Sequence, residues 1–220
     1  MSRAYTTRDM ANTARCSSRA DKLPRLFELA AAQGGHFTSA QARELGYSAR
    51  SLLHHVSAGH FERVSRGFYR LVGVPAGPHD DVVAAWLRFA PHRAVVSHDT
   101  ALALYDLAPS RSYAIHLTLP REHRPRNSPP ATGVELHTTT VPLRRDEVAT
   151  RFGVEITSPA RTIIDAAEIG VDPSVVIEAT ARALATGLVT SGELRAAVGP
   201  SSARVRRLVE RAIQEAGAHA

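Results

Sequence analysis

The segment 37–71, FTSAQARELGYSARSLLHHVSAGHFERVSRGFYRL, constrains the fold of this chain more than any other part of the sequence. Thr38 with Gln41 three residues later is a capping-box pattern, which predicts the start of a helix, and Gly46 is placed to end it. A single residue separates this glycine from Ser48, which is placed to cap the next helix. The segment therefore predicts two helices joined by a very short turn.

A β-hairpin is expected after these helices. Segments 60–64 (HFERV) and 68–71 (FYRL) are rich in aromatic and β-branched residues, and the turn 65–67 between them contains a glycine. A further helix is expected to begin near Asp21 and to end at the glycine pair 34–35. A helix, a pair of helices with a short turn and a hairpin, in this order, form a winged helix-turn-helix.

The spacing of apolar residues predicts which helix faces are buried. The first and the last of these three helices carry apolar side chains at i, i+3, i+4 and i+7. We expect these side chains to face the core: Leu23, Leu26, Phe27 and Ala30 in the first helix, and Ala49, Leu52, Leu53 and Val56 in the last. The outward face of the last helix is then expected to carry Arg50, Ser51, His54, His55 and Ala58.

The outward face and the hairpin have the chemistry of a DNA-reading device. A recognition helix contacts base edges near its N-terminus, while flanking cations hold phosphates. We expect two sets of DNA-binding residues: Ser48, Arg50, Ser51 and His54 at base edges or adjacent phosphates, and Arg63, Arg66, Tyr69 and Arg70 on the DNA backbone. The alternative is a small helical domain whose charged face is merely solvated.

The distribution of charge supports the DNA-binding interpretation. Residues 1–72 hold 11 Lys and Arg against 5 Asp and Glu, which accounts for the whole net charge of +6, whereas residues 73–220 hold 16 of each. Excess positive charge confined to one segment suggests contact with nucleic acid there. In the polar tail, Arg3, Arg8, Arg15 and Arg19 are placed to form an arm into the minor groove.

The rest of the chain predicts a second domain. The Pro- and Gly-rich segment 73–78 is a linker. We expect an α+β fold, with a disordered basic tail over 1–20, a winged helix over 21–72, and a mixed α/β domain with a helical end over 79–220. Its expected strands are AVV (94–96), AIHLTLP (114–120), VELHTTTV (134–141) and GVEITS (153–158). The Pro- and Arg-rich loop 120–130 is either a connector or a docking surface.

The chain resembles the AbiEi-type antitoxins over about residues 22–200. Its hairpin matches their G-x-[apolar]-x-R-[apolar]-x-R-G-x-Y pattern at Gly59, Phe61, Arg63, Val64, Arg66, Gly67 and Tyr69. SHDTALALYDL, IHLTLP and GVEITSPARTIIDAA are similar to further segments of that family. The resemblance implies an antitoxin encoded beside a nucleotidyltransferase-like toxin. It also implies repression of the shared promoter through inverted repeats, as a monomer or weak dimer that binds double-stranded DNA cooperatively.

Enzymatic, metal and cofactor functions find no support in the sequence motifs. Lys22 is the only lysine, so the E-x-K triplet of restriction-type nucleases is absent. There is no H-E-x-x-H, cysteine cluster or Gly-rich phosphate loop. His98 and His116 are expected to form structural hydrogen bonds. Ser97, His98 and Asp99 are contiguous, which argues against a catalytic triad. We therefore expect no enzymatic activity, no cofactor and no metal.

Two local expectations concern the second domain and the tail. Arg161 and Asp165 lie four residues apart, which predicts an ion pair on a helix whose residues 162–164 face the core. The single Cys16, without a partner, is compatible with a reducing compartment.

With no apolar run long enough to span a membrane and no signal peptide, we expect a cytoplasmic protein.

Two rival functions remain open. The first is a general winged-helix transcription regulator whose second domain senses a ligand or a protein. The second is an enzyme that processes nucleic acid, which metal-dependent cleavage or transfer by the purified protein would support.

Overall fold

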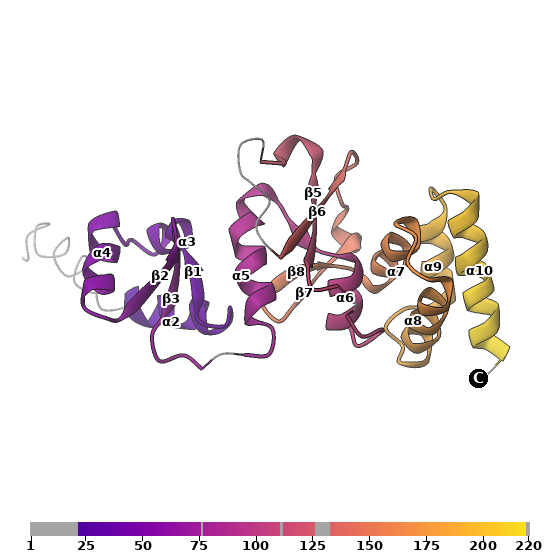
Figure 1. The fold of residues 1–220 in the computed structure, drawn as a ribbon, viewed down its shortest axis with the longest axis horizontal. Coiled ribbons are helices and arrows are strands. Elements are labelled where there is room, and N and C mark those ends of the chain that lie inside the picture. The colour runs from indigo at the N-terminus through magenta and orange to yellow at the C-terminus, as the bar shows by residue number, and fades with distance from the viewer. Residues whose placement is uncertain (1–21, 76, 111, 126–132, 219–220) are drawn as a thin grey trace, which may run out of the picture. The chain divides into compact units, whose positions relative to one another are not determined.

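The computed structural model describes residues 22–75, 77–110, 112–125 and 133–218 (Figure 1). The chain divides into two compact units, the first ending at Arg88 and the second beginning at Phe89. The domain limits expected from the sequence stay a prediction. The expectations for the basic tail, for Cys16 and for the tip of the loop 120–130 lie outside the described residues.

The first unit has the element order expected of a winged helix-turn-helix. Its elements are α2 (Lys22–Ala31), β1 (His36–Thr38), α3 (Ser39–Glu44), α4 (Ala49–Ser57), β2 (Phe61–Ser65) and β3 (Phe68–Leu71). The helix α5 (Asp80–Phe89) extends to the boundary between the units. The predicted capping box is present, since the Thr38 side chain accepts from the Gln41 backbone N–H and the Gln41 side chain accepts from the Thr38 N–H.

The three strands form one antiparallel sheet in the order β1-β3-β2. In the hairpin, Arg63 lies opposite Tyr69, and the register then shifts so that Ser65 lies opposite Phe68. The turn requires a left-handed backbone at Gly67, whose φ is +76°. The Gly67 carbonyl accepts a 2.8 Å hydrogen bond from the backbone N–H of Ser39, which ties the hairpin turn to the start of α3.

Two of the predicted buried faces are corrected by the structure. In α2, Leu26 is fully buried, but Leu23 and Phe27 are 50% and 53% exposed. The buried face runs instead through Leu26, Leu29 and Ala30 of α2 and continues to Gln33 in the turn that follows the helix. This face has the same i, i+3, i+4, i+7 spacing, but it ends in a polar residue. Gln33 is accommodated because its amide donates to the Leu29 carbonyl and accepts from the Gln41 side chain.

The same correction applies to α4. Leu52 is 3% exposed, whereas Leu53 is 56% exposed and lies on the outward side of the helix. The His55 ring replaces it on the inner side, stacked on Phe61 with the ring centroids 4.6 Å apart. The core of the unit centres on Phe37, whose ring contacts those of Phe61 and Tyr69. Ala49 is also exposed, so the expectations that Ala49 and Leu53 face inward and His55 outward are wrong.

The second unit combines a mixed sheet with helices. Its strands are β4 (Val95–Val96), β5 (Ile115–Pro120), β6 (Val134–Thr139), β7 (Val148–Arg151) and β8 (Val154–Thr157). They lie in the order β6-β5-β4-β8-β7. The pairs β5/β6 and β4/β8 are parallel, and the pairs β4/β5 and β7/β8 are antiparallel. The α+β fold predicted from the sequence is confirmed, with β7 as a strand that the prediction missed.

Helices complete the second unit, and side chains cap the starts of several of them. They are α6 (His98–Leu104), α7 (Pro159–Glu168), α8 (Pro173–Ala185), α9 (Ser191–Val198) and α10 (Ala203–Ala218), with short 3₁₀ turns η1 (Ala90–His92), η2 (Arg121–His123) and η3 (Arg145–Glu147). Ser158, Asp172 and Thr190 accept hydrogen bonds from the first turns of α7, α8 and α9. Ser97 stands at the N-cap of α6 but makes no such bond.

Candidate nucleic-acid interface

The N-terminal half of α4 presents an exposed polar face in the first unit. Ser48 caps the helix, because its Oγ accepts from the backbone N–H of Ser51 at 3.1 Å. Arg50 and His54 are exposed, and Ser51 is half-buried. Arg50, Leu53 and His54 share one helix face by their spacing, so the exposed leucine lies between an arginine and a histidine.

The hairpin beside α4 carries two further cations. Arg63 and Arg66 are exposed, Arg63 on β2 and Arg66 in the turn that follows it. Residues opposite each other on paired strands project on the same side of a sheet, so Arg63 projects on the side of Tyr69. Because Phe37 stacks on Tyr69, this is also the side of the sheet that packs on the helices.

A groove lies between α3, the start of α4 and the hairpin turn. Its lining residues are Ser39, Arg43, Tyr47, Ala49, Leu52, Arg66, Gly67 and Tyr69. Two arginines, Arg43 from α3 and Arg66 from the turn, therefore border one depression beside the N-terminus of α4. Sequence reasoning missed Arg43, because only the short turn after α3 brings this helix alongside α4.

The structure separates Tyr69 from Arg70. The Tyr69 side chain is 7% exposed, yet it borders the groove. Adjacent strand residues project to opposite faces of a sheet, so Arg70 projects away from Tyr69. There its guanidinium donates to the Val74 carbonyl at 2.8 Å and lies 3.9 Å from an Asp80 carboxylate oxygen. Arg70 is accordingly left out of the interface proposed below.

The electrostatics of this surface are one-sided. Within the described part of the chain, Arg43, Arg50, Arg63 and Arg66 form no ion pair. At the C-terminal end of α4, burial and the neighbouring His60 and His54 lower the pKa of His55, which favours its neutral form. The positive potential at neutral pH therefore comes from the arginines.

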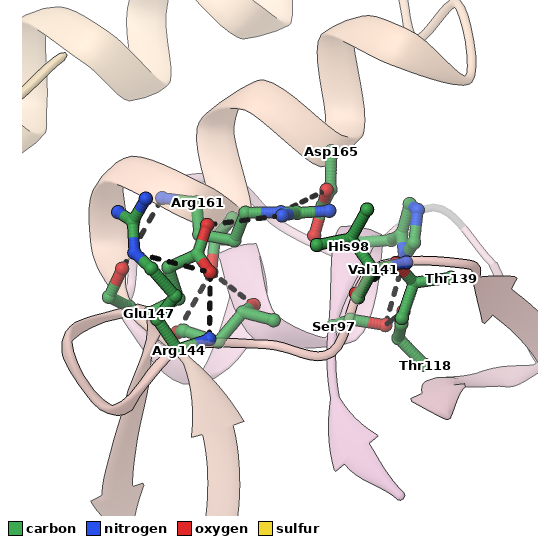
Figure 2. A network of polar contacts seen from close by, with 12 residues as sticks. Ser97, His98, Thr118, Thr139, Val141, Arg144, Glu147, Arg161 and Asp165 are labelled. Carbon is green, nitrogen blue, oxygen red and sulfur yellow. Dashed lines mark hydrogen bonds and ion pairs between the residues drawn. The ribbon is translucent and has the colours of Figure 1, made fainter. Parts of the chain in front are cut away.

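Arg161, Asp165 and Glu147 of the second unit form a partly buried network of ion pairs (Figure 2). Arg161 Nε donates to Asp165 Oδ1 at 2.6 Å, and Arg161 Nη1 donates to Glu147 Oε1 at 3.2 Å. The predicted ion pair and the predicted burial of residues 162–164 are thus confirmed. Burial raises the pKa of Asp165 to about 6, an effect larger than the opposing one of the Arg161 guanidinium. This network joins α7 to the 3₁₀ turn η3.

A second polar group stands at the start of α6. His98 Nδ1 and Ser97 Oγ are 2.8 Å apart, and Thr118 Oγ1 donates to Ser97 Oγ at 2.8 Å (Figure 2). Asp99 instead accepts from the Ser110 hydroxyl and the Ser112 backbone N–H. Ser97, His98 and Asp99 therefore do not converge as a triad. Burial, with His137, His116 and Arg161 nearby, lowers the pKa of His98 to about 3.

Comparison with known proteins relates the first unit to one protein family. Residues 24–72 match a family model described as "Transcriptional regulator, AbiEi antitoxin". Over these residues the first unit is similar to the AbiEi antitoxin family of transcriptional regulators. The matched AbiEi domain holds all the interface residues described above, from Ser39 to Tyr69. No curated protein matches the chain.

The fold of the chain also has a counterpart among solved structures. It is similar to the crystal structure of the RV2827C protein from Mycobacterium tuberculosis, with a TM-score of 0.54 and 13% identity. The similarity covers 87% of this chain and 75% of that one, and at this identity it concerns the fold alone. No helix among the described residues is both long and apolar enough to cross a membrane.

Proposed function

We propose that this chain is an antitoxin that binds promoter DNA through its AbiEi domain and represses the operon that encodes it. The observation that carries the proposal is a set of four arginines around α4 and the hairpin, all within the matched segment, that have no acidic partner among the described residues: Arg43, Arg50, Arg63 and Arg66. Phosphate contacts supply much of the affinity of such proteins, and they need unpaired cations. Two of these cations, Arg43 and Arg66, border one groove beside the N-terminus of α4, which a merely solvated charged face would not require.

The geometry favours α4 as the recognition helix. In winged helices of this order, the second helix of the pair enters the major groove and contacts base edges near its N-terminus. Arg50 is the side chain best suited to a guanine edge, because its planar guanidinium can donate two parallel hydrogen bonds. Leu53 adds an apolar group for a thymine methyl, and His54 extends the polar face by one turn.

Backbone phosphates are assigned to the groove beside α4. Arg43 and Arg66 border it from two sides, and the N-terminus of α4 contributes unpaired backbone N–H groups and the positive end of its dipole. The Tyr69 hydroxyl is assigned to the same phosphate, and Arg63 to the next one along the strand. Ser48 acts as the helix cap, and Ser51 lies beside it.

The second unit is assigned the antitoxin role. We propose that it counteracts a nucleotidyltransferase-like toxin encoded next to this chain, without enzymatic activity of its own, in the cytoplasm. The protein is proposed to bind inverted repeats as a monomer or weak dimer that assembles cooperatively on DNA. The alternative is a winged-helix regulator whose second unit senses a ligand or another protein.

A mobility-shift assay tests the DNA-binding half of the proposal. The full chain is titrated against a labelled duplex from its own upstream region, with the shuffled sequence as control. The proposal expects binding to the upstream duplex at least about a thousandfold tighter than to the shuffled one. Equal affinity for the two duplexes would contradict specific repression.

A coexpression assay tests the proposed toxin partner. This chain is coexpressed with the protein from the neighbouring gene, and relief of growth arrest is measured. The proposal expects rescue of growth by this chain. Absence of rescue together with specific DNA binding would favour the general regulator.

A further inference from the structure

A second candidate site lies on the sheet of the second unit, at the pair β5/β6. These strands are parallel, and their register places His116 opposite Glu135 and Thr118 opposite His137. Residues two apart on a strand project to the same side, so Glu135 and His137 lie on the same side of the sheet as His116. The sheet thus brings two imidazoles and one carboxylate together from segments about twenty residues apart in the chain.

The three side chains converge closely. One potential ligand atom from each lies within 4.8 Å of the other two. His116 Nδ1 is 2.9 Å from His137 Nε2, and the Glu135 carboxylate oxygens lie 3.7 Å from His137 Nε2 and 3.9 Å from His116 Nε2. Ligands at the usual distance from a tetrahedral zinc ion are about 3.3 Å apart. With one ring nitrogen of His116 as its ligand atom, the cluster lies within 4.8 Å and would contract by up to about 1.5 Å around the ion.

One atom of the cluster has no hydrogen-bond partner. His116 is buried, with its side chain 7% exposed, and its Nε2 makes no hydrogen bond within the described part of the chain. A buried ring nitrogen without a partner is destabilising, because it has lost its hydrogen bonds to water. A metal ion bound by this cluster would remove that penalty, because it accepts the lone pair of a neutral imidazole.

The surroundings hold the cluster in place. The His98 ring stacks on the His137 ring with centroids 3.8 Å apart, and His98 is itself fixed by the Ser97 hydroxyl. The backbone N–H of His116 donates to Thr100 Oγ1 at 2.9 Å. His137 therefore packs against a buried ring, while Glu135, 56% exposed, lies on the solvent side.

We propose that His116, Glu135 and His137 form a binding site for a divalent transition-metal ion, with Zn²⁺ the best fit. Two imidazoles and a carboxylate are a known ligand set for tetrahedral zinc, whereas Mg²⁺ and Ca²⁺ prefer oxygen ligands alone. Three protein ligands leave the fourth position for water. The bound ion would link β6, at the end of the strand order, to its neighbour β5. This proposal does not depend on the DNA-binding function.

The test is zinc binding to the full chain. Chelator-treated protein is titrated with Zn²⁺ against a chromophoric chelator, which gives stoichiometry and affinity together. One tight zinc ion per chain is expected, and Glu135→Gln should weaken it by at least about tenfold. Glu135 is exposed, so this substitution leaves the core intact, and circular dichroism verifies the fold. Affinity of Glu135→Gln equal to that of the wild type, or no tight binding at all, would overturn the proposal.

Matched variants exclude other binding sites. Glu122→Gln removes an exposed carboxylate from the same unit and should leave zinc affinity unchanged. His60→Ala removes one member of the His55–His60 pair in the first unit, whose Nδ1 atoms are 3.3 Å apart. Zinc binding lost in His60→Ala and retained in His137→Ala would place the ion in the first unit and sink the proposal. Zinc should also raise the melting temperature of the wild type more than that of Glu135→Gln, since ligand binding to the folded state stabilises it in proportion to the logarithm of the affinity.

Discussion

Arg50 lies in the first turn of α4, on the outward face that it shares with Leu53 and His54. An arginine that reads a base contributes to discrimination between sequences, whereas one that holds a phosphate strengthens binding to all of them. Arg50→Ala is expected to weaken binding to the cognate operator by about 1–3 kcal/mol, with a much smaller loss on random DNA. Fluorescence anisotropy with both duplexes measures the difference. Arg207→Ala on α10 removes the same charge from the second unit and serves as control. Equal losses on both duplexes would make Arg50 a phosphate contact.

Arg66 tests the groove. Because it is assigned to a phosphate, Arg66→Ala should weaken binding to every sequence and reduce the slope of log affinity against log salt by about 1. Arg70→Ala is the informative comparison, since the Arg70 guanidinium is directed to Val74 and Asp80. Its slope should equal that of the wild type. Should Arg66→Ala leave the slope intact while Arg70→Ala lowers it, the assignment of cations from this structure would be reversed.

At the scale of elements, hydrophobic spacing predicted the helices but not all of their faces. In α2 and α4, two apolar stripes overlap. The buried stripe of α4 contains His55, and that of α2 continues into Gln33, which lies just past the end of the helix. Hydrophobic periodicity predicts that such a polar residue is exposed. The sequence alone does not show the hydrogen bond or ring contact that accommodates the residue in the core. The strand β7 (Val148–Arg151) was missed because it is short and is stabilised by pairing with β8.

The orientation of α4 can be measured with two adjacent leucines. Leu52 is 3% exposed and Leu53 is 56% exposed. Leu52→Ala is expected to lower the free energy of unfolding by about 2–5 kcal/mol, because it opens a cavity in the core. Leu53→Ala is expected to change it by at most about 0.5 kcal/mol. Urea denaturation of both variants measures the two effects. A larger loss for Leu53→Ala would restore the helix face expected from the sequence.

The ion pair in α7 differs in kind from those on the surface. Arg161 is bonded to Asp165 and Glu147 in a buried network, whereas Arg182 pairs with Glu178 on the exposed side of α8. Arg161→Ala leaves Asp165 buried without its partner and is expected to destabilise the protein by about 3 kcal/mol. Arg182→Ala should cost less than about 1 kcal/mol. Thermal denaturation of the two variants compares them directly, and equal costs would show that burial adds nothing to the Arg161 network.

For the whole molecule, the sequence located the candidate DNA interface better than it did the zinc cluster. The helix pair and hairpin are local in the chain, so their spacing alone predicts Arg50, Arg63 and Arg66 as neighbours. The zinc cluster depends on the parallel pairing of β5 with β6, which no local spacing reveals. The segment VELHTTTV did contain a signal, since Glu135 and His137 share one face of any strand. None of the fixed metal-binding motifs contains this pattern, so the sequence analysis predicted no metal site.

The salt dependence of DNA affinity can show how many molecules of the whole chain assemble on an operator. Three phosphate-directed arginines per chain, Arg43, Arg63 and Arg66, give an expected slope of about −2.7 for one molecule on a half-site, since each contact contributes about −0.9. Two molecules assembled on a full inverted repeat should double it to about −5.4. The measurement is a salt titration of binding to half-site and full-repeat duplexes, with stoichiometry from analytical ultracentrifugation. A slope and a stoichiometry that stay the same on both duplexes would mean that one molecule covers the repeat, because no second set of phosphates is then neutralised.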